Sequence, residues 1–322
     1  MVGALTRTPP RYTGLRPPGP GSRHRMTDPV VARRFERAVV TGGAGFVGAH
    51  LCELLLEEDI EVVAVDNLVT SSADTLDHLR RHERFRFVRH DVTQPMPLSC
   101  ETDVVFHLAS AASPRDYLAL PIETLRAGSH GTENALELAR RDGARFVLAS
   151  TSEVYGDPLE HPQREEYWGN VNPIGPRSVY DEAKRYAEAL TSAYRRELGA
   201  DTAIARIFNT YGPGMRAHDG RMIPAFLDQA LRNEPITVTG TGEQTRSICY
   251  VEDTVRGLLA LARSDHPGPV NIGNPHELTV RQVADRIKEI TGSGSPVTYV
   301  DAVVDDPRRR CPDISLARDV LG

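Results

Sequence analysis

The sequence lacks three features that would each define a class of protein. No apolar run approaches the roughly 20 residues that cross a bilayer, which argues against an integral membrane protein. Its four cysteines, Cys52, Cys100, Cys249 and Cys311, show neither CxxC pairs nor metal-ligand spacing, so we expect reduced thiols, no metal site and a cytoplasmic location. There is no basic excess either: 38 Lys and Arg against 44 Asp and Glu give a net charge of -6, which is atypical of a nucleic-acid-binding protein.

The N-terminus also lacks an apolar segment of the kind that a secretory signal contains. Residues 1–36 are instead basic and rich in Pro and Gly, and we expect them to form a disordered arm. Two explanations of this arm remain open. Translation starts at Met26, which we favour, or the arm contacts a partner.

What the sequence does contain is an alternation of short apolar runs with helical patterns. We expect strands at 37–41, 61–66, 85–88, 103–108, 145–150, 203–207 and 270–273, and helices at 46–58, 121–141, 177–198, 221–232, 252–263 and 279–291. Strands joined by helices of this length form a parallel sheet. The predicted class is therefore α/β, a Rossmann-type doubly wound parallel sheet. We assign 37–210 to a nucleotide-binding domain and 211–322 mainly to a smaller substrate-binding lobe, with some elements returning to the first domain.

A glycine-rich segment, TGGAGFVG (41–48), joins the first predicted strand to the first predicted helix. Gly43, Gly45 and Gly48 satisfy GxGxxG, a pattern that lets the backbone approach a pyrophosphate at a helix N-terminus. Asp66 ends the second strand, where a carboxylate binds ribose hydroxyls and repels a 2′-phosphate, so NAD is favoured over NADP. We assign cofactor binding to Gly42, Gly45, Phe46, Val47, Gly48, Asp66, Asn67, Asp91, Val92, Leu108, Ala109, Tyr180 and Lys184.

Tyr180 and Lys184 form a Tyr-x-x-x-Lys pair within a predicted helix. The i, i+4 spacing places both side chains on one face. A free tyrosine has a pKa near 10, and a neighbouring ammonium together with a cationic nicotinamide favours its phenolate. This pair can therefore accept a proton from a sugar hydroxyl as hydride leaves. The pattern is common by itself, and it gains meaning from the glycine motif and from SerThrSer at 150–152.

With these motifs the chain resembles the extended short-chain dehydrogenases/reductases and, more narrowly, the UDP-glucuronate decarboxylases, or UDP-xylose synthases. The resemblance runs from about residue 37 to the C-terminus. It is carried by TGGAGFVG (41–48), STSEVYGDP (150–158), YWGNVNPIGPRSVYDEAKR (167–185), ARIFNTYGP (205–213) and DDPRRRCPDI (305–314).

The resemblance implies a cycle without net redox change. Tyr180 removes the C4 hydroxyl proton while C4 gives hydride to NAD, the 4-ketone acts as an electron sink for loss of carbon dioxide, C5 is protonated, and hydride returns to C4.

The resemblance also implies roles for other residues. Thr151 bonds the C4 oxygen, Glu153 points at the sugar ring and handles a water or proton, and Arg310 reaches the ring or the carboxylate; with Tyr180 and Lys184 these are the expected catalytic residues. For substrate binding the expected residues are Ser152, Asn209, Arg221, Arg246, which meets the diphosphate, and Arg310. Cys311 departs from the family pattern, which usually has a basic residue there.

Several alternatives remain open. A 4,6-dehydratase needs an acid where Ser152 stands, and a 4-epimerase is not expected to pair Glu153 with Arg310. A related decarboxylase releases the 4-ketopentose instead of reducing it, an outcome that the sequence does not separate. A non-catalytic NAD-binding regulator shares the fold, but such proteins commonly lack Tyr180 and Lys184.

The expected partners are a UDP-sugar substrate and a second copy of the chain, with neither nucleic acid nor membrane. By resemblance, the helices at 121–141 and 177–198 pair across a two-fold axis in a homodimer. Their apolar positions, such as Leu136, Leu138, Ala187, Leu190 and Tyr194, could face either this interface or the sheet.

Overall fold

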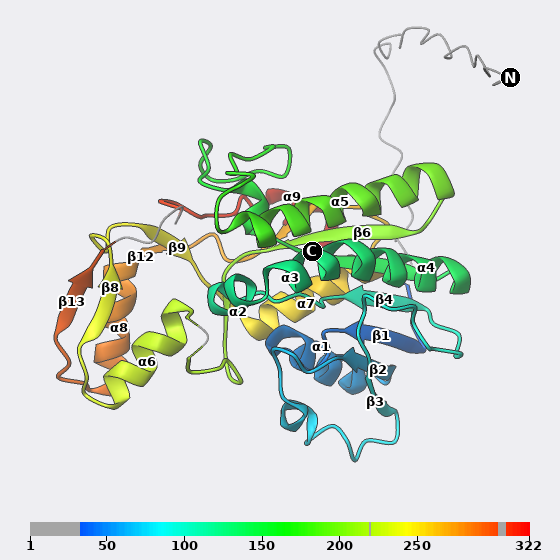
Figure 1. The fold of residues 1–322 in the computed structure, drawn as a ribbon, viewed down its shortest axis with the longest axis horizontal. Helices are drawn as coiled ribbons and strands as arrows, with labels where there is room; N and C mark the ends of the chain where they lie inside the picture. The colour runs from blue at the N-terminus through cyan, green and yellow to red at the C-terminus, as the bar shows by residue number, and fades with distance from the viewer. Residues whose placement is uncertain (1–32, 219, 302–306) are drawn as a thin grey trace, which may run out of the picture. The chain divides into compact units, whose positions relative to one another are not determined.

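A central parallel sheet organises the computed structural model, which describes residues 33–218, 220–301 and 307–322. Its strands are β1 Arg37–Thr41, β2 Glu61–Asp66, β3 Phe85–Arg89, β4 Val104–His107, β5 Arg145–Thr151, β6 Thr202–Ile207 and β11 Val270–Ile272. They pair in parallel in the order β11-β6-β5-β4-β1-β2-β3 (Figure 1). The chain reverses its direction across the sheet between β1 and β4, which is where a doubly wound sheet opens its binding crevice. The predicted α/β Rossmann-type fold is confirmed.

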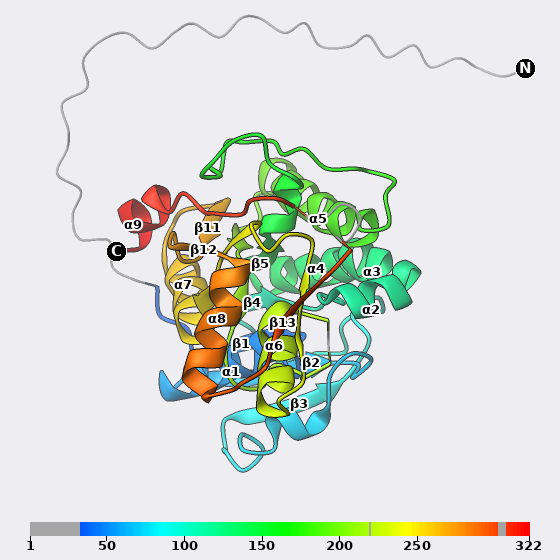
Figure 2. The same ribbon diagram turned by 90° about the vertical axis from the view of Figure 1, so that its left-hand side faces the viewer.

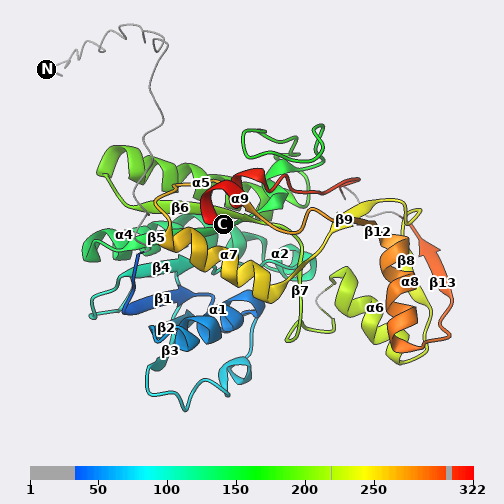
Figure 3. The ribbon, with the colours of Figure 1, turned by 180° about the vertical axis from the view of Figure 1, so that it is seen from behind.

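Helices cover both faces of this sheet because its strands are apolar on both sides. One face carries α1 Phe46–Glu57, α7 Val251–Arg263 and α9 Ser315–Leu321 (Figure 3), and the other carries α3 Pro121–Arg126, α4 Thr132–Asp142 and α5 Ser178–Leu198 (Figure 1). Side chains of β1 alternate between the two layers: Val40 packs with Leu51 and Leu258, whereas Val39 packs with Leu136 and Ala187.

The helix expected over 121–141 is interrupted by a π-helical turn, Ala127–Gly131, between α3 and α4. Gly128 permits this turn to lie against α5, since a Cβ there would come within 2.7 Å of the Ala183 Cβ. Gly131 is similarly packed against Val92. The single regular helix predicted for 121–141 is therefore wrong: two helices joined by a π turn allow close contact with α5, which carries Tyr180 and Lys184. Such π turns recur at functional sites.

Of the five apolar positions whose orientation was left open, three face the sheet and two are half-buried at the edge of the same core. Leu136, Leu138 and Ala187 are buried in the core beneath α4 and α5, and Leu190 and Tyr194 pack against that core.

A smaller set of elements lies beyond the carboxyl ends of the sheet, with its own apolar cluster that includes Phe226, Ile236, Val283 and Ile287 (Figure 2). It contains α6 Met222–Leu231, β8 Ile236–Thr239, α8 Val280–Thr291 and β13 Val297–Val300. The remaining elements are α2 Pro114–Ala119, β7 Thr210–Tyr211, β9 Thr245–Ser247, β10 Cys249–Tyr250, β12 Glu277–Thr279 and two 3-10 turns, Ala73–Leu76 and Ser152–Tyr155. The predicted division of the chain near residue 210 stays a prediction.

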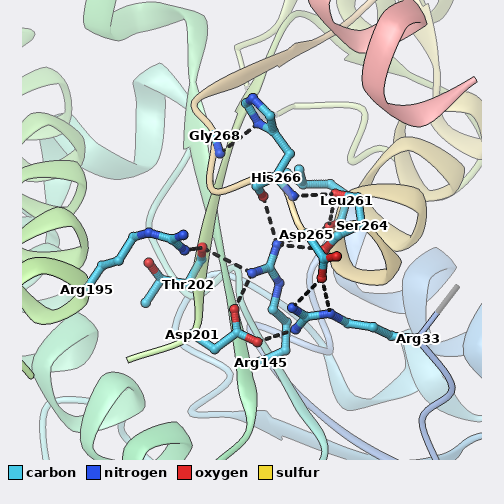
Figure 4. Close-up of polar contacts among 10 residues, drawn as sticks. All are labelled: Arg33, Arg145, Arg195, Asp201, Thr202, Leu261, Ser264, Asp265, His266 and Gly268. Carbon is cyan, nitrogen blue, oxygen red and sulfur yellow. Dashed lines mark hydrogen bonds and ion pairs between the residues drawn. The ribbon is translucent and has the colours of Figure 1, made fainter. Parts of the chain in front are cut away.

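At the amino end of the sheet, opposite the crevice, the start of β5 carries a buried guanidinium (Figure 4). Arg145 pairs with Asp201 and donates to the carbonyls of Ser264 at 3.1 Å and His266 at 2.8 Å. Arg33 pairs with the same Asp201 and, at 2.8 Å, with Asp265. This network joins β5 to the loops that follow α5 and α7.

Most of the predicted N-terminal arm lies outside the described residues. Within the described ranges, no helix combines the length and apolar character that crossing a membrane requires.

Candidate active site

A cavity of about 780 Å³ lies at the carboxyl ends of the strands. All the residues that the sequence analysis assigned to catalysis, cofactor binding or substrate binding line it. Its lining joins the loops after β1, β2, β4 and β5 to residues of α5, α6 and the segment around Arg310. Positions far apart in the chain thus face one volume large enough for two ligands of nucleotide size.

The floor of the cavity on the β1 side is a backbone cradle. Gly42 has φ +71°, a conformation that L side chains rarely adopt, and a Cβ on Gly48 would lie 2.2 Å from the Gly42 carbonyl oxygen. Gly45 directly precedes α1 and has no side chain to cap its first turn. The first N–H groups of α1 and the positive end of its dipole therefore face the cavity, which favours a bound pyrophosphate.

Beside this cradle, acidic and amide side chains end β2 and β3. The buried Asp66 carboxylate accepts hydrogen bonds from the Ala44 N–H at 3.1 Å, the Leu68 N–H at 2.8 Å and the Ser71 hydroxyl at 2.9 Å. Asn67 Nδ2 lies 3.4 Å from Asp91 Oδ2. This arrangement suits the hydroxyls of a ribose and disfavours an added phosphate.

Tyr180 and Lys184 lie on the buried side of α5, above the end of β5. Burial raises the pKa of the Tyr180 phenol, and a hydrogen bond with the Thr151 side chain acts in the opposite direction. Lys184 Nζ donates to the Ala149 carbonyl at 2.8 Å and lies 5.9 Å from the Tyr180 ring centroid. Burial lowers the pKa of Lys184 to about 8, so it is largely an ammonium at neutral pH. Because burial outweighs the hydrogen bond with Thr151, the phenol keeps its proton when no ligand is bound.

Glu153 lies between two guanidinium groups. Arg310 pairs with one of its oxygens, and Arg177 Nη2 lies 2.6 Å from the other. Although burial opposes ionisation, the two arginines, Arg310 first, hold the pKa of Glu153 at about 2. Glu153 is therefore a carboxylate at any physiological pH. The cluster carries two positive charges and one negative charge, which leaves a net positive charge to meet an anionic ligand.

The other predicted substrate-side residues line the same cavity. Ser152 is buried directly before Glu153, and the Asn209 carbonyl accepts the Cys249 N–H at 2.8 Å. The Arg246 guanidinium donates to the Thr245 and Pro307 carbonyls, both at 2.8 Å. Arg221 begins α6, and its charge favours the Tyr180 phenolate.

Three residues at this site were not named from the sequence. Arg177 holds Glu153, Tyr117 stacks on Tyr180 with ring centroids 5.4 Å apart, and the buried Asp181 has one oxygen without a hydrogen-bond partner in the described structure. For Arg177 a signal was present, since it precedes Tyr180 by three positions at the start of the same helix. Tyr117 and Asp181 gave none, because the stacking of Tyr117 on Tyr180 and the charges of Glu153 and Arg310 beside Asp181 come from segments distant in sequence.

Comparison with known proteins places this site in a family. Residues 38–273 match the model of the NAD dependent epimerase/dehydratase family. The chain belongs to the NAD dependent epimerase/dehydratase family. It is 53% identical to "UDP-glucuronic acid decarboxylase 6" of Arabidopsis thaliana over 89% of this chain and 83% of that protein. It is 50% identical to "UDP-glucuronic acid decarboxylase 1" of Xenopus tropicalis over 89% of this chain and 68% of that one. The resemblance to UDP-glucuronate decarboxylases is thereby confirmed.

A solved structure agrees with this placement. A UDP-glucuronic acid 4-epimerase mutant from Bacillus cereus, in complex with UDP-4-deoxy-4-fluoro-glucuronic acid and NAD, matches with a TM-score of 0.79 at 27% identity. The match covers 88% of this chain and 92% of that one.

The family is NAD dependent, and the residues present here fit that cofactor. Gly42, Gly45 and Gly48 leave room for the pyrophosphate, while Asp66 sits at the end of β2 where ribose hydroxyls need an acceptor. NAD is therefore the cofactor, as the sequence predicted.

Proposed function

We propose that this chain decarboxylates UDP-glucuronate to UDP-xylose through a 4-keto intermediate. The observation that carries the proposal is one cavity that contains Tyr180 with Thr151 and, beside them, Glu153 between Arg177 and Arg310. The first pair serves oxidation at C4, and the second group offers a positive site for a C6 carboxylate. When bound, NAD would supply the hydride acceptor for oxidation at C4 and the hydride donor for the final reduction.

Tyr180 is the residue that accepts the C4 hydroxyl proton. Its buried phenol needs a positive field to ionise, and the charges of Lys184 and Arg221 provide part of that field. Thr151, bonded to the phenol, holds the C4 oxygen in line for this transfer. Lys184 is fixed by the Ala149 carbonyl and so positions its charge below the ring.

Arg310 and Arg177 bind and orient the uronate end of the substrate. A guanidinium matches a carboxylate with two parallel hydrogen bonds. Because the pKa of Glu153 is about 2, we assign Glu153 the task of holding both arginines rather than of donating a proton. Ser152 stands where a dehydratase needs an acid, which argues against expulsion of a C6 hydroxyl. Arg246 and Asn209 complete the site toward the diphosphate.

Purified protein supplied with NAD and UDP-glucuronate tests the proposal. We expect a nucleotide sugar lighter by carbon dioxide, reduced at C4, with no accumulation of NADH. A product of unchanged mass would indicate an epimerase, and a released 4-ketopentose with matching NADH would indicate the non-reducing decarboxylase. Tyr180→Phe should keep NAD binding but lose turnover by about 10²- to 10⁴-fold; unchanged turnover would refute the assigned base.

We further propose that the chain forms a homodimer through α3 and α5. Ile122, Leu125 and Tyr186 on these helices are exposed apolar side chains, and α3 packs along α5. Leu125→Arg should shift the sedimentation coefficient to that of a monomer, and a dimer that persists would refute this interface.

We also propose a cytoplasmic, reducing location, which the four free cysteines support. Fractionation of cells expressing the tagged chain tests it, and recovery outside the cytoplasm would overturn it.

A further inference from the structure

Outside the nucleotide cavity, three side chains with metal-binding atoms meet. His161 lies in the loop between the 3-10 turn Ser152–Tyr155 and α5, Glu277 begins β12, and Cys311 follows Arg310. One donor atom from each lies within 4.8 Å of the other two, and His161 Nε2 is 3.1 Å from Glu277 Oε2. Their sequence separation has no recognisable motif, which is why no metal site was expected.

The backbone around this group is fixed by hydrogen bonds among the three segments and the neighbouring strand β9. Gln163 N–H donates to the Cys311 carbonyl at 2.8 Å, and Cys311 N–H donates to Gln163 Oε1 at 2.8 Å. Ser247, which pairs with Glu277 between β9 and β12, donates its N–H to the Arg310 carbonyl at 3.1 Å. The three donors are therefore held together before any ion arrives, as a specific site requires.

We propose that His161, Glu277 and Cys311 bind a zinc ion. The set of one imidazole, one carboxylate and one thiolate matches the ligands that Zn²⁺ accepts in tetrahedral sites, with the fourth position left for water. Ligand bonds of about 2.0–2.3 Å require the three donors to draw closer than they are now. The partly exposed His161 and Glu277 side chains can make this movement, whereas the buried Cys311 stays in place.

Binding releases one proton, from the Cys311 thiol to solvent, and no electron moves. The thiol donates to the Pro275 carbonyl at 3.4 Å, and this hydrogen bond is given up with the proton. The buried Ser247 hydroxyl has no hydrogen-bond partner in the described structure and is available to donate to the thiolate. Such outer contacts raise metal affinity and orient the ligand. The partly exposed imidazole gives the ion a path from solvent.

Because Cys311 is next to Arg310, a bound zinc ion would affect the position of an active-site residue. Arg310 precedes Cys311 and pairs with Glu153 in the nucleotide cavity. A zinc ion would fasten this segment to the loop of His161 and to β12. The bound state is therefore the more stable one, and it holds Arg310 in the orientation described above.

The first test measures Zn²⁺ alone binding to the full chain with NAD present, by competition with a chromophoric chelator. We expect one tight equivalent per chain, and a loss of affinity of roughly tenfold or more in Cys311→Ser and in His161→Gln, at least the effect of removing an outer contact. His161→Gln changes a partly exposed side chain and is therefore the safer variant for folding. Cys100→Ser, at a half-buried cysteine outside the site, is the matched control and should bind as the parent does.

The second test uses Co²⁺, whose thiolate complex absorbs in the near ultraviolet. This band should appear with the parent protein and disappear in Cys311→Ser. Thermal unfolding should shift up by several degrees with Zn²⁺ and return after chelation, and the shift should be absent in Cys311→Lys. Zinc binding that survives both His161→Gln and Cys311→Ser, or no binding by the parent above the level of these variants, would overturn the proposal.

Discussion

Replacing Arg177 with methionine tests whether Glu153 is held ionised by two arginines. The pKa of Glu153 lies at about 2, below its ordinary value of 4.5, although burial acts in the opposite direction, so the attraction of the two arginines outweighs the cost of burying the carboxylate. Arg310 is the larger contributor and Arg177 the smaller. Arg177→Met leaves one oxygen of a buried carboxylate without its partner and should lower the free energy of unfolding by about 1–3 kcal/mol at pH 7.

The sign of the pH dependence follows from the direction of the shift. A carboxylate whose folded pKa is depressed stabilises the protein fully above its unfolded pKa, near 4.5, and loses that contribution as pH falls toward 2. Arg177 also lowers the pKa of Asp181, which lies at about 7, so both proteins are compared in an Asp181→Asn background; there the difference between them should be constant from pH 8 to about pH 5.5. It should shrink as the pH is lowered to 3.

Urea unfolding at fixed protein concentration measures both effects. Arg164→Met is the matched control in the same loop, because Arg164 and Glu166 form an exposed pair 3.8 Å apart, and its effect should stay within about 0.5 kcal/mol. In a Glu153→Gln background, Arg177→Met should lose most of its cost. An effect as small as the control's, or one that is equal at pH 7 and pH 3, would refute the reasoning.

Three further changes probe the cradle, the buried acid beside the site and the sheet's opposite end. Gly48→Ala should weaken NAD binding by about tenfold or more, because its Cβ would lie 2.2 Å from a carbonyl oxygen and overpacking costs about 1–3 kcal/mol. Gly294→Ala is the control and should leave NAD binding unchanged, because the space around Gly294 is open. Isothermal titration calorimetry measures both affinities. Burial and then the Glu153 charge raise the pKa of Asp181 to about 7, so the folded state loses stability as pH rises from about 4 to 7, by up to about 4 kcal/mol. Asp181→Asn should remove this loss, and equal slopes of unfolding free energy against pH would contradict it. Arg145→Met should lower the free energy of unfolding by about 1–3 kcal/mol, because it removes the ion pair with Asp201 and the donor to the Ser264 and His266 carbonyls. Turnover per folded molecule should stay unchanged, and loss of turnover without loss of stability would argue against a purely structural network.

The local pattern of residues was enough to predict most strands and helices of the fold and the cofactor-binding motif. Strands such as β2 are apolar runs with distinct ends, and Gly42, Gly45 and Gly48 follow a strand directly, so their roles depend on neighbours within a few positions. The Tyr180 and Lys184 pair is likewise set by helix geometry, because four residues make about one turn. Glu153 and Arg310 were placed together only through the resemblance, and Arg177 was not placed at all.

Tertiary packing determined the features that depend on contacts between residues far apart in the sequence. The helix over 121–141 is divided because Gly128 meets Ala183 of a helix that comes later in the chain. Leu136 and Ala187 face the sheet because the strands, rather than a second copy, lie beneath them. The charge state of Glu153 depends on guanidinium groups from two other segments. A pKa, a cluster of ligands or a buried face is a property of atoms close in space, and the order of residues along the chain specifies such proximity only through the completed fold.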